Sequence, residues 1–379
     1  MDISRMVFRE DHEMLRQTAA RFIERECLPR QAAWDAAGRV DRETWQKAGR
    51  EGLLCTTIPA EYGGGGGDFG HAAVVYEAIA SSGVSGLGFG LHSDIIAPYF
   101  VRLGTEEQKR RWLPGICAGE LILAIGMSEP GSGSDLKAIR TTARRQGDEY
   151  VINGSKIFIS NGLNCDLLLL ACKTDPEAGA KGVSLVVVEA SRAGFRRGRK
   201  LDKVGMPAGD TAELFFDDVR VPVSNRLGEE GQGFAYMMQE LAQERLLIAI
   251  SCARILEVQL EHTLAYVKER QAFGHTVWDF QNTRFKLADV KAQAVATRVL
   301  VDHYIGEHMR RKLTLQEAAI AKLYATETMW KAIDEMVQVH GGYGYMRDYP
   351  IGRAFGDLRY TRIAGGTNEV MRELISRAL

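Results

Sequence analysis

A carboxylate lies on an apolar helical stripe in the second half of the chain. Met237, Leu241 and Ile248 recur at helical spacing, and Glu244 falls on the same stripe. A carboxylate among apolar side chains is costly unless it is paired or protonated. Burial would raise its pKa and suit it to act as a general base, whereas an ion pair with Arg245 or with a basic group on a neighbouring helix would make it structural. Composition alone favours the ion pair.

A second candidate is a run of small and hydroxyl-bearing residues that could hold a ligand. Residues 126–135 read Gly-Met-Ser-Glu-Pro-Gly-Ser-Gly-Ser-Asp. Pro130 excludes the usual dinucleotide turn, and no Lys-Ser/Thr pair closes a Walker loop. The small residues leave backbone N–H groups free, the serines add donors, and Glu129 and Asp135 would add acceptors. One such turn is usually only a helix cap, but the length and order of this run favour a cofactor.

The segments that must position these residues change character twice. Residues 1–120 show helical periodicity, residues 121–228 favour short strands separated by turns, and residues 229–379 hold long stretches without Gly or Pro. We therefore expect an α+β, mostly α protein with an N-terminal α-helical domain, a small antiparallel β-barrel or sandwich domain, and a C-terminal helix bundle.

Two local patterns give more specific predictions. Residues 11–27 predict one helix that Pro29 stops. Asn153-Gly154, between the strand-like runs 150–152 and 155–159, predicts a two-residue β-hairpin.

Composition limits the class of protein. The 379 residues are 45% hydrophobic and 26% charged, which is typical of a globular protein. The net charge of −1 gives no positive electrostatic field that would attract nucleic acid. The apolar stretches are too short to span a membrane, and the first residues do not resemble an export signal. The six cysteines form no CxxC pair and the eight histidines no ligand spacing. We therefore expect reduced thiols and no metal.

Five segments together resemble one family. Residues 126–135 resemble the signature loop of the acyl-CoA dehydrogenases, which lines the flavin of FAD in those enzymes. Residues 158–162 resemble the strand that covers the isoalloxazine ring. Residues 270–274 and 338–342 resemble segments that hold the FAD of a neighbouring subunit, and residues 367–369 resemble the last FAD contact. The implied FAD contacts are Ile125, Gly126, Met127, Ser128, Gly133, Ser134, Phe158, Ile159, Ser160, Arg270, Phe273, Gln281, Gln338, Gly341, Gly342, Thr367, Asn368 and Glu369.

The resemblance also changes the interpretation of Glu244. Most members carry the catalytic glutamate just before Gly-Thr near the C-terminus, where this chain has Gly365. The long-chain and isovaleryl members instead place the base in a Glu-Arg-Leu run on the helix, as at residues 244–246. The resemblance therefore implies that Glu244 is the base and that Gly365 contributes only a backbone N–H to the thioester oxygen. Its implied substrate contacts are Ser134, Arg245, Ala364 and Gly366.

The implied reaction is FAD-dependent α,β-dehydrogenation of a saturated acyl-CoA to the trans-2-enoyl-CoA, within fatty-acid or branched-chain catabolism. Glu244 would take the Cα proton, the flavin would take the Cβ hydride, and electrons would pass to an electron-transfer flavoprotein. Ala364, where many straight-chain enzymes have Tyr, leaves room for a branched acyl group, whereas residues 243–249 are more similar to the long-chain member. Acyl length and branching therefore stay open.

Three further expectations complete the sequence-based account. The resemblance implies a C-terminal four-helix bundle and a homo-oligomer, as a dimer of dimers, because FAD contacts cross subunits. It implies a cytoplasmic protein in a bacterium, or a matrix protein in a mitochondrion. The alternatives are a flavin-dependent oxidase or monooxygenase of the same fold that uses O₂, and a non-catalytic protein on that fold.

Overall fold

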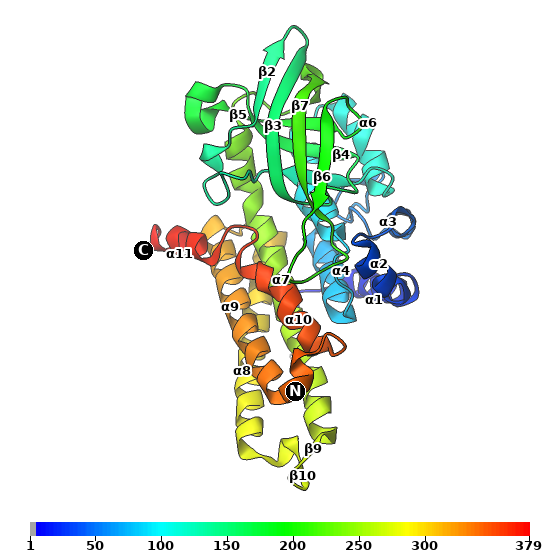
Figure 1. The fold of residues 1–379 in the computed structure, drawn as a ribbon, viewed down its shortest axis with the longest axis vertical. Helices are drawn as coiled ribbons and strands as arrows, with labels where there is room; N and C mark the ends of the chain where they lie inside the picture. Colours follow the sequence, from blue (N-terminus) through cyan, green and yellow to red (C-terminus); the bar gives the residue numbers. More distant parts are fainter. Residues whose placement is uncertain (1–4) are drawn as a thin grey trace.

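The computed structural model describes residues 5–379 and has three parts, shown in Figure 1. The N-terminal part is helical, the middle part is a β-sheet, and the C-terminal part consists mainly of long helices. This architecture confirms the predicted fold class. The helices of the first part are α1 (Glu10–Phe22), α2 (Gln31–Ala37), α3 (Arg42–Arg50), α4 (Phe69–Ser82), α5 (Ala97–Leu103) and α6 (Glu106–Cys117). The domain boundaries predicted at residues 120 and 228 stay predictions.

The predicted stop at Pro29 is wrong. The α-helix ends earlier, at Phe22, and the chain continues through a π-helical segment, Ile23–Cys27, and a 3-10 turn, Leu28–Arg30, into α2. Pro29 lies in the first turn of the 3-10 segment, where its missing N–H costs no intrahelical hydrogen bond. The proline therefore begins a new turn instead of ending the helical region.

The middle part is one eight-stranded sheet. Its order is β6-β7-β3-β2-β4-β5-β8, and β1 pairs with β4. Most pairings are antiparallel, as predicted, but β4 pairs in parallel with both β1 and β2. The strands are β1 (Leu123–Gly126), β2 (Thr142–Gln146), β3 (Glu149–Ser160), β4 (Leu167–Lys173), β5 (Val183–Glu189), β6 (Phe195–Lys200), β7 (Thr211–Pro222) and β8 (Arg226–Leu227).

The hairpin predicted at Asn153-Gly154 is also wrong. Strand β3 continues through both residues, and its pairing with β7 shifts register between Ile152 and Gly154. Gly154 has a φ of +144°, and a Cβ atom there would lie 2.6 Å from Oγ1 of Thr141. The Asn-Gly pair therefore marks an irregularity in a long strand, where only a glycine fits beside the neighbouring backbone. This continuity carries the second half of β3 toward the loop at residues 126–135.

Long helices form the C-terminal part. Helices α7 (Gly233–Glu269), α8 (Gln281–Met309) and α9 (Leu315–His340) pack on one another, with the shorter α10 (Pro350–Leu358) and α11 (Asn368–Ser376) against them. Helix α4 of the first part also joins their apolar core. At the end of the bundle far from the sheet, a short hairpin of β9 (Gln271–Ala272) and β10 (His275–Thr276) connects α7 to α8 (Figure 1).

Within residues 5–379, no helix is both long enough and apolar enough to cross a bilayer.

Asp94 is a buried carboxyl in the π-helical segment Leu91–Ile96. It is 4% exposed, and its Oδ1 atom has no hydrogen-bond partner among the residues that the structure describes. Burial raises the pKa of Asp94 from 3.8 to about 8. Because the folded-state pKa lies above the unfolded value, the contribution to stability is complete below the unfolded pKa. It is lost as the pH rises through the folded pKa.

We expect Asp94→Asn to stabilise the protein increasingly as the pH rises from 5 to 8. Asparagine has nearly the same shape but cannot ionise, so the variant avoids the cost of keeping a buried carboxyl protonated. Each pH unit in this window adds at most about 1.4 kcal/mol in favour of the variant. Thermal unfolding followed by circular dichroism at several pH values measures the difference in Tm. Asp334→Asn on the exposed face of α9 is the control, and a pH-independent difference for Asp94→Asn would contradict the prediction.

Candidate functional site

Glu244 and Gly365 lie side by side although they belong to distant segments. Glu244 is in the first half of α7, and Gly365 is in the turn before α11. A Cβ atom added at Gly365 would lie 3.5 Å from Oε1 of Glu244 and 2.8 Å from Cδ1 of Ile248. The Glu244 carboxylate therefore occupies the space beside a residue that has no side chain. The structure thus brings together the two residues that the sequence pairs in one catalytic role, while the role itself stays a prediction.

The surroundings of Glu244 favour a base over a structural ion pair. Burial raises the pKa of Glu244, and the positive charges of Arg245 and Lys322 partly oppose this effect. Arg245 lies beside it but donates from Nε to the carbonyl oxygen of Gly365 at 3.3 Å. The side chain of Glu244 remains partly accessible. It is therefore a poorly solvated carboxylate that a ligand could still reach.

The turn at Gly365 and Gly366 has an unusual backbone. The φ angles are +65° and +87°, in the region that favours glycine. The N–H of Ala364 donates to the carbonyl oxygen of Tyr360 at 2.9 Å, whereas the N–H of Gly365 has no acceptor within the described part of the chain. Gly365 is only partly buried, so this N–H is not enclosed by the protein. The free N–H of Gly365, close to the Glu244 carboxylate, is therefore available to a ligand oxygen.

The loop at residues 126–135 only partly follows the expectation. The predicted acceptor Glu129 points inward, where it accepts hydrogen bonds from the N–H groups of Arg140 at 2.6 Å and Thr141 at 3.0 Å. Ser132 is also buried and donates from Oγ to the carbonyl oxygen of Asp135. These two side chains brace the loop and do not face a ligand, because the loop needs internal partners for its own polar groups.

The outer face of the same loop is open. Cβ atoms built at Gly131 and Gly133 would meet nothing within 4 Å, and Ser134 is exposed. Ile125 and Gly126 lie in β1, and Met127 and Ser128 follow directly and are partly buried. The carbonyl of Ser128 accepts a hydrogen bond from the N–H of Ile157, which ties the loop to β3 at 3.0 Å. The predicted contacts in the loop therefore lie together at the end of the sheet.

Sequence reasoning missed Lys156, which holds the loop from below. Its side chain is enclosed, and its Nζ lies 2.8 Å from Oε1 of Glu129 and donates to the carbonyl oxygen of Met127 at 2.9 Å. Although burial acts to raise the pKa of Glu129, Lys156 and the backbone donors hold it below its usual value. The available signal was a lysine in the same strand as the buried Tyr150 and Ile152, at the two-residue spacing that places side chains on one face of a strand.

Phe158 is an exposed aromatic residue in a strained backbone conformation. Its side chain is 67% exposed, and its φ is +61°. Exposed aromatic surface and a positive φ in a non-glycine residue both carry a cost, and their combination is typical of functional surfaces. The contact with a cofactor stays a prediction. Ser160 is also exposed, whereas the side chain of Ile159 is buried in the sheet. Ile159 could therefore serve a ligand only through its backbone.

A cavity of about 590 Å³ collects another group of predicted residues at the far end of the bundle. Arg270, Gln338, Gly341 and Gly342 all line it. The guanidinium carbon of Arg270 lies 5.3 Å from the ring centroid of Tyr343, and Cβ atoms at both glycines would meet nothing within 4 Å. The cavity thus offers a cation, an aromatic ring and open backbone, which suit a phosphate-bearing ligand.

Phe273 and Gln281 do not line this cavity and lie at the surface. Phe273 is 94% exposed with a φ of +54°, at the tip of the β9–β10 hairpin, and Gln281 is exposed at the start of α8. So exposed an aromatic residue at the tip of a hairpin is typical of a contact surface.

The two groups of predicted ligand contacts lie at opposite ends of α7. The loop after β1 is near the start of this helix, where Lys137 Nζ lies 5.8 Å from the ring centroid of Phe234. Arg270 directly follows the last residue of the helix. Since α7 has 37 residues, its length is about 55 Å. Within one chain, the two groups face separate regions, as Figure 1 shows for the sheet and the β9–β10 hairpin.

The last predicted contacts lie at the N-terminus of α11. Thr367 caps this helix by accepting a hydrogen bond from the N–H of Val370, and Glu369 is exposed. Asn368 is 1% exposed, and its amide bonds to side chains of α9. The side chain of Asn368 is therefore used inside the protein, and only its backbone is left for a ligand.

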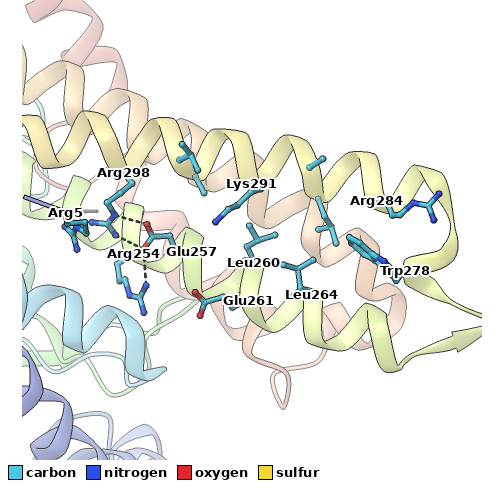
Figure 2. Close-up of a pocket in the computed structure, with 14 residues that line it drawn as sticks. Arg5, Arg254, Glu257, Leu260, Glu261, Leu264, Trp278, Arg284, Lys291 and Arg298 are labelled. Carbon is cyan, nitrogen blue, oxygen red and sulfur yellow. Dashed lines mark hydrogen bonds and ion pairs between the residues drawn. The ribbon is translucent and has the colours of Figure 1, made fainter. Parts of the chain in front are cut away.

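A second cavity, of about 610 Å³, lies between α7 and α8 and contains none of the predicted site residues. Figure 2 shows its polar end, where Glu257 pairs with Arg254 and Arg298. Arg298 also pairs with the enclosed carboxylate of Glu77 in α4. These contacts connect α4, α7 and α8, so this end of the cavity has a structural explanation.

One group of residues has the composition of a metal site. Ligand atoms of Asp11, His12 and His71 lie within 4.8 Å of one another. However, both histidines already contact Oδ1 of Asp68, the residue that caps α4, at 2.8 and 3.1 Å. The group therefore has a structural role at the start of α4, and the predicted absence of a metal stays a prediction.

Comparisons with known proteins cover the whole length of the chain. Family models for the N-terminal, middle and C-terminal domains of acyl-CoA dehydrogenases match residues 9–120, 124–219 and 231–379. The mitochondrial long-chain specific acyl-CoA dehydrogenase of Sus scrofa is 47% identical over 377 residues, which cover 99% of this chain and 88% of the relative. The mitochondrial isovaleryl-CoA dehydrogenase of Pongo abelii is 36% identical over 374 residues, which cover 97% and 88%.

Solved structures give the same result for the fold. An acyl-CoA dehydrogenase from Geobacillus kaustophilus superposes with a TM-score of 0.97 and 46% identity, covering 99% of both chains. An acyl-CoA dehydrogenase from Bacillus anthracis, complexed with FAD, superposes with a TM-score of 0.92 and 30% identity, covering 98% of this chain and 66% of that one. The three-part fold described above is therefore shared with these proteins over its full length.

Proposed function

Because the chain belongs to the acyl-CoA dehydrogenase family, we propose that it oxidises a saturated acyl-CoA to the trans-2-enoyl-CoA with Glu244 as the base. Members of this family are FAD-dependent oxidoreductases that act on the CH–CH group of acyl-CoA. The predicted resemblance to the long-chain and isovaleryl members is confirmed by the 47% and 36% identities. The observation that carries the proposal is the Glu244 carboxylate, 3.5 Å from the position of a Gly365 Cβ atom.

The residues present fit FAD. Phe158 offers an exposed ring at the end of the sheet, and the loop at Gly131 and Gly133 leaves open space beside it. Arg270, at the other end of α7, offers a cation for a pyrophosphate. When bound, the flavin supplies the two-electron acceptor for the Cβ hydride. Oxidation of a saturated C–C bond requires such an acceptor.

Proton removal is the step that the chain's own residues perform. The Cα proton of a thioester is weakly acidic, so its removal needs a poorly solvated base and a donor for the developing enolate oxygen. Burial raises the pKa of Glu244, which strengthens it as a base. The N–H of Gly365 is free to donate to the thioester oxygen. The base and the donor thus come from α7 and from the turn that faces it.

The remaining contacts concern substrate and assembly. Arg245 contacts the Gly365 turn, and Ala364 and Gly366 flank Gly365, so these predicted substrate contacts lie around the base. Ser134 is exposed on the loop at the end of the sheet. Since Arg270 and Phe158 lie at opposite ends of α7, we propose that each FAD is held by two subunits of a homo-oligomer. The proposed electron acceptor is an electron-transfer flavoprotein.

Anaerobic mixing of the FAD-loaded protein with acyl-CoA thioesters tests the function. We expect a substrate to bleach the flavin absorbance, and a panel of straight and branched acyl chains identifies which groups fit beside Ala364. Reoxidation by electron-transfer flavoprotein should be much faster than reoxidation by O₂. Faster reoxidation by O₂ would identify an oxidase or monooxygenase, and the absence of bleaching across the panel would contradict the proposed function.

A further inference from the structure

Lys322 is a lysine inside the protein, next to the Gly365–Gly366 turn. It lies on α9 among small apolar residues and is 0% exposed. Its Nζ donates to the carbonyl oxygen of Gly366 at 2.5 Å and to Oδ1 of Asn368 at 3.2 Å. Both acceptors are neutral. A buried ammonium group is costly without a charged hydrogen-bond acceptor, so its presence calls for a reason beyond packing.

The charge of Lys322 acts on the proposed base. Burial lowers the pKa of Lys322 to about 8, so the group is mostly protonated at neutral pH. The titratable or charged groups that act on it are Glu244, Arg245 and Cys252 of α7 and Glu369 of α11. Its positive charge in turn opposes the effect of burial on Glu244. Lys322 and Glu244 also meet the same turn, because Lys322 binds the carbonyl oxygen of Gly366 and the Glu244 carboxylate lies beside Gly365. No hydrogen bond joins the two side chains.

Lys322 and Arg245 also hold the turn from two sides. Arg245 donates to the carbonyl oxygen of Gly365, and Lys322 donates to the carbonyl oxygen of Gly366. Both glycines have positive φ angles, and glycine is the most conformationally free residue. The two donors therefore limit how the two peptide groups that follow Gly365 and Gly366 can rotate. The peptide group that carries the free N–H of Gly365 directly precedes them in the same turn.

We propose that Lys322 is a positioning residue for proton removal at Cα: it fixes the Gly365–Gly366 turn and keeps Glu244 available as a carboxylate. This inference rests on the proposed role of Glu244 as the base. Lys322 forms no hydrogen bond with Glu244. In this proposal it does not contact the substrate either. Two separable effects follow, one from its hydrogen bond and one from its charge.

Two substitutions separate these effects. Lys322→Gln keeps a donor for Gly366 but removes the charge, whereas Lys322→Met removes both. The rate of anaerobic flavin bleaching by a substrate is measured from pH 5 to pH 9. For Lys322→Gln we expect the acid limb of the profile to move to higher pH by about one unit, because an opposite charge nearby lowers a carboxyl pKa by that order. For Lys322→Met we expect, in addition, at least a tenfold lower rate at the plateau, with little change in the apparent Kd of the substrate.

Thr326→Val is the matched control on the same helix. Thr326 accepts a hydrogen bond from the amide of Asn368, as part of the same α9–α11 contact, but does not reach the glycine turn. We expect this variant to keep the pH profile and plateau of the parent even if its Tm falls. If it reproduces the changes of the Lys322 variants, or if both Lys322 variants keep the parent profile and plateau, Lys322 is only structural and the inference is overturned.

A second readout separates this inference from the proposed function. The protonation of Glu244 is followed by infrared difference spectroscopy against pH, with Glu244→Gln identifying its band. The Lys322→Gln variant should show Glu244 ionising at higher pH than in the parent, and an unchanged titration would overturn the inference. This measurement needs no turnover. If none of the acyl-CoA thioesters tested bleaches the flavin of the parent protein, the proposed function is rejected, and the infrared test is unaffected.

Discussion

Glu244→Gln should lower the rate of flavin bleaching by an acyl-CoA substrate by about 10³-fold or more, while FAD and substrate still bind. Glutamine has the size of glutamate and can occupy the same space beside Gly365, but it cannot accept the Cα proton. General bases typically contribute 10²–10⁴-fold to a rate, and Glu244 supplies the only carboxylate among the three described atoms nearest to a Gly365 Cβ position. Stopped-flow absorbance gives the rate, and equilibrium titration with a product enoyl-CoA gives the affinity.

Glu240→Gln is the matched control for this prediction. Glu240 lies one turn earlier on α7, and burial also raises its pKa, but it forms an ion pair with Arg102. We expect this variant to bleach at a rate close to that of the parent. If Glu244→Gln also keeps that rate, the base lies elsewhere and the central claim about the site is wrong. If both variants lose activity equally, the effect comes from α7 as a whole.

Lys156→Met should cause the largest loss of stability among the substitutions considered. Methionine fills the space but leaves the Glu129 carboxylate buried and without its cation. Breaking a buried ion pair from one side costs about 3–5 kcal/mol. The loop at residues 126–135 should loosen, since Lys156 also holds the carbonyl of Met127. We therefore expect a clearly lower Tm and a higher dissociation constant for FAD, measured by thermal unfolding and by flavin fluorescence.

The double variant Lys156→Met, Glu129→Gln tests the cause of that loss. Removing the carboxylate's charge as well should recover a large part of the stability, because no unpaired charge then remains in the interior. A double variant as unstable as Lys156→Met would show that the loss comes from packing alone, against the prediction. Glu149→Gln is the control. Glu149 lies on β3, the strand of Lys156, and forms an exposed ion pair with Arg220 of β7. This variant should change the stability by less than about 1 kcal/mol.

The sequence predicted the proximity of Glu244 and Gly365, the proposed catalytic residues, better than it predicted the loop at residues 126–135. Glu244 and Gly365 could be predicted together because the missing glutamate and the relocated one explain each other. The inward direction of the Glu129 side chain could not be predicted, because its partner Lys156 lies on β3 beyond Asn153-Gly154. The hairpin predicted there would have reversed the strand before Lys156. Propensity at two residues was overridden by the long pairing of β3 with β7.

Other differences also have local physical causes. The helical region continues past Pro29 because a proline is tolerated in the first turn of a new helical segment. Lys322 carried a readable signal that was missed: it interrupts a stripe with Ala318, Ala325 and Met329 at helical spacing. A charged residue on such a stripe is the same kind of pattern that identified Glu244. Only its contacts with the Gly366 turn, which depend on tertiary packing, could show its purpose.

The length of α7 has a consequence for how the protein keeps its cofactor. The exposed Phe158 and the cavity around Arg270 are separated by a helix of 37 residues. In the proposed homo-oligomer, each subunit would contribute one half of two different FAD sites, and neither half would hold FAD until two chains associate. Dilution that dissociates the subunits would then release FAD as well, since FAD binding and subunit association are linked by mass action. Flavin loss and subunit separation would be one event seen by two methods.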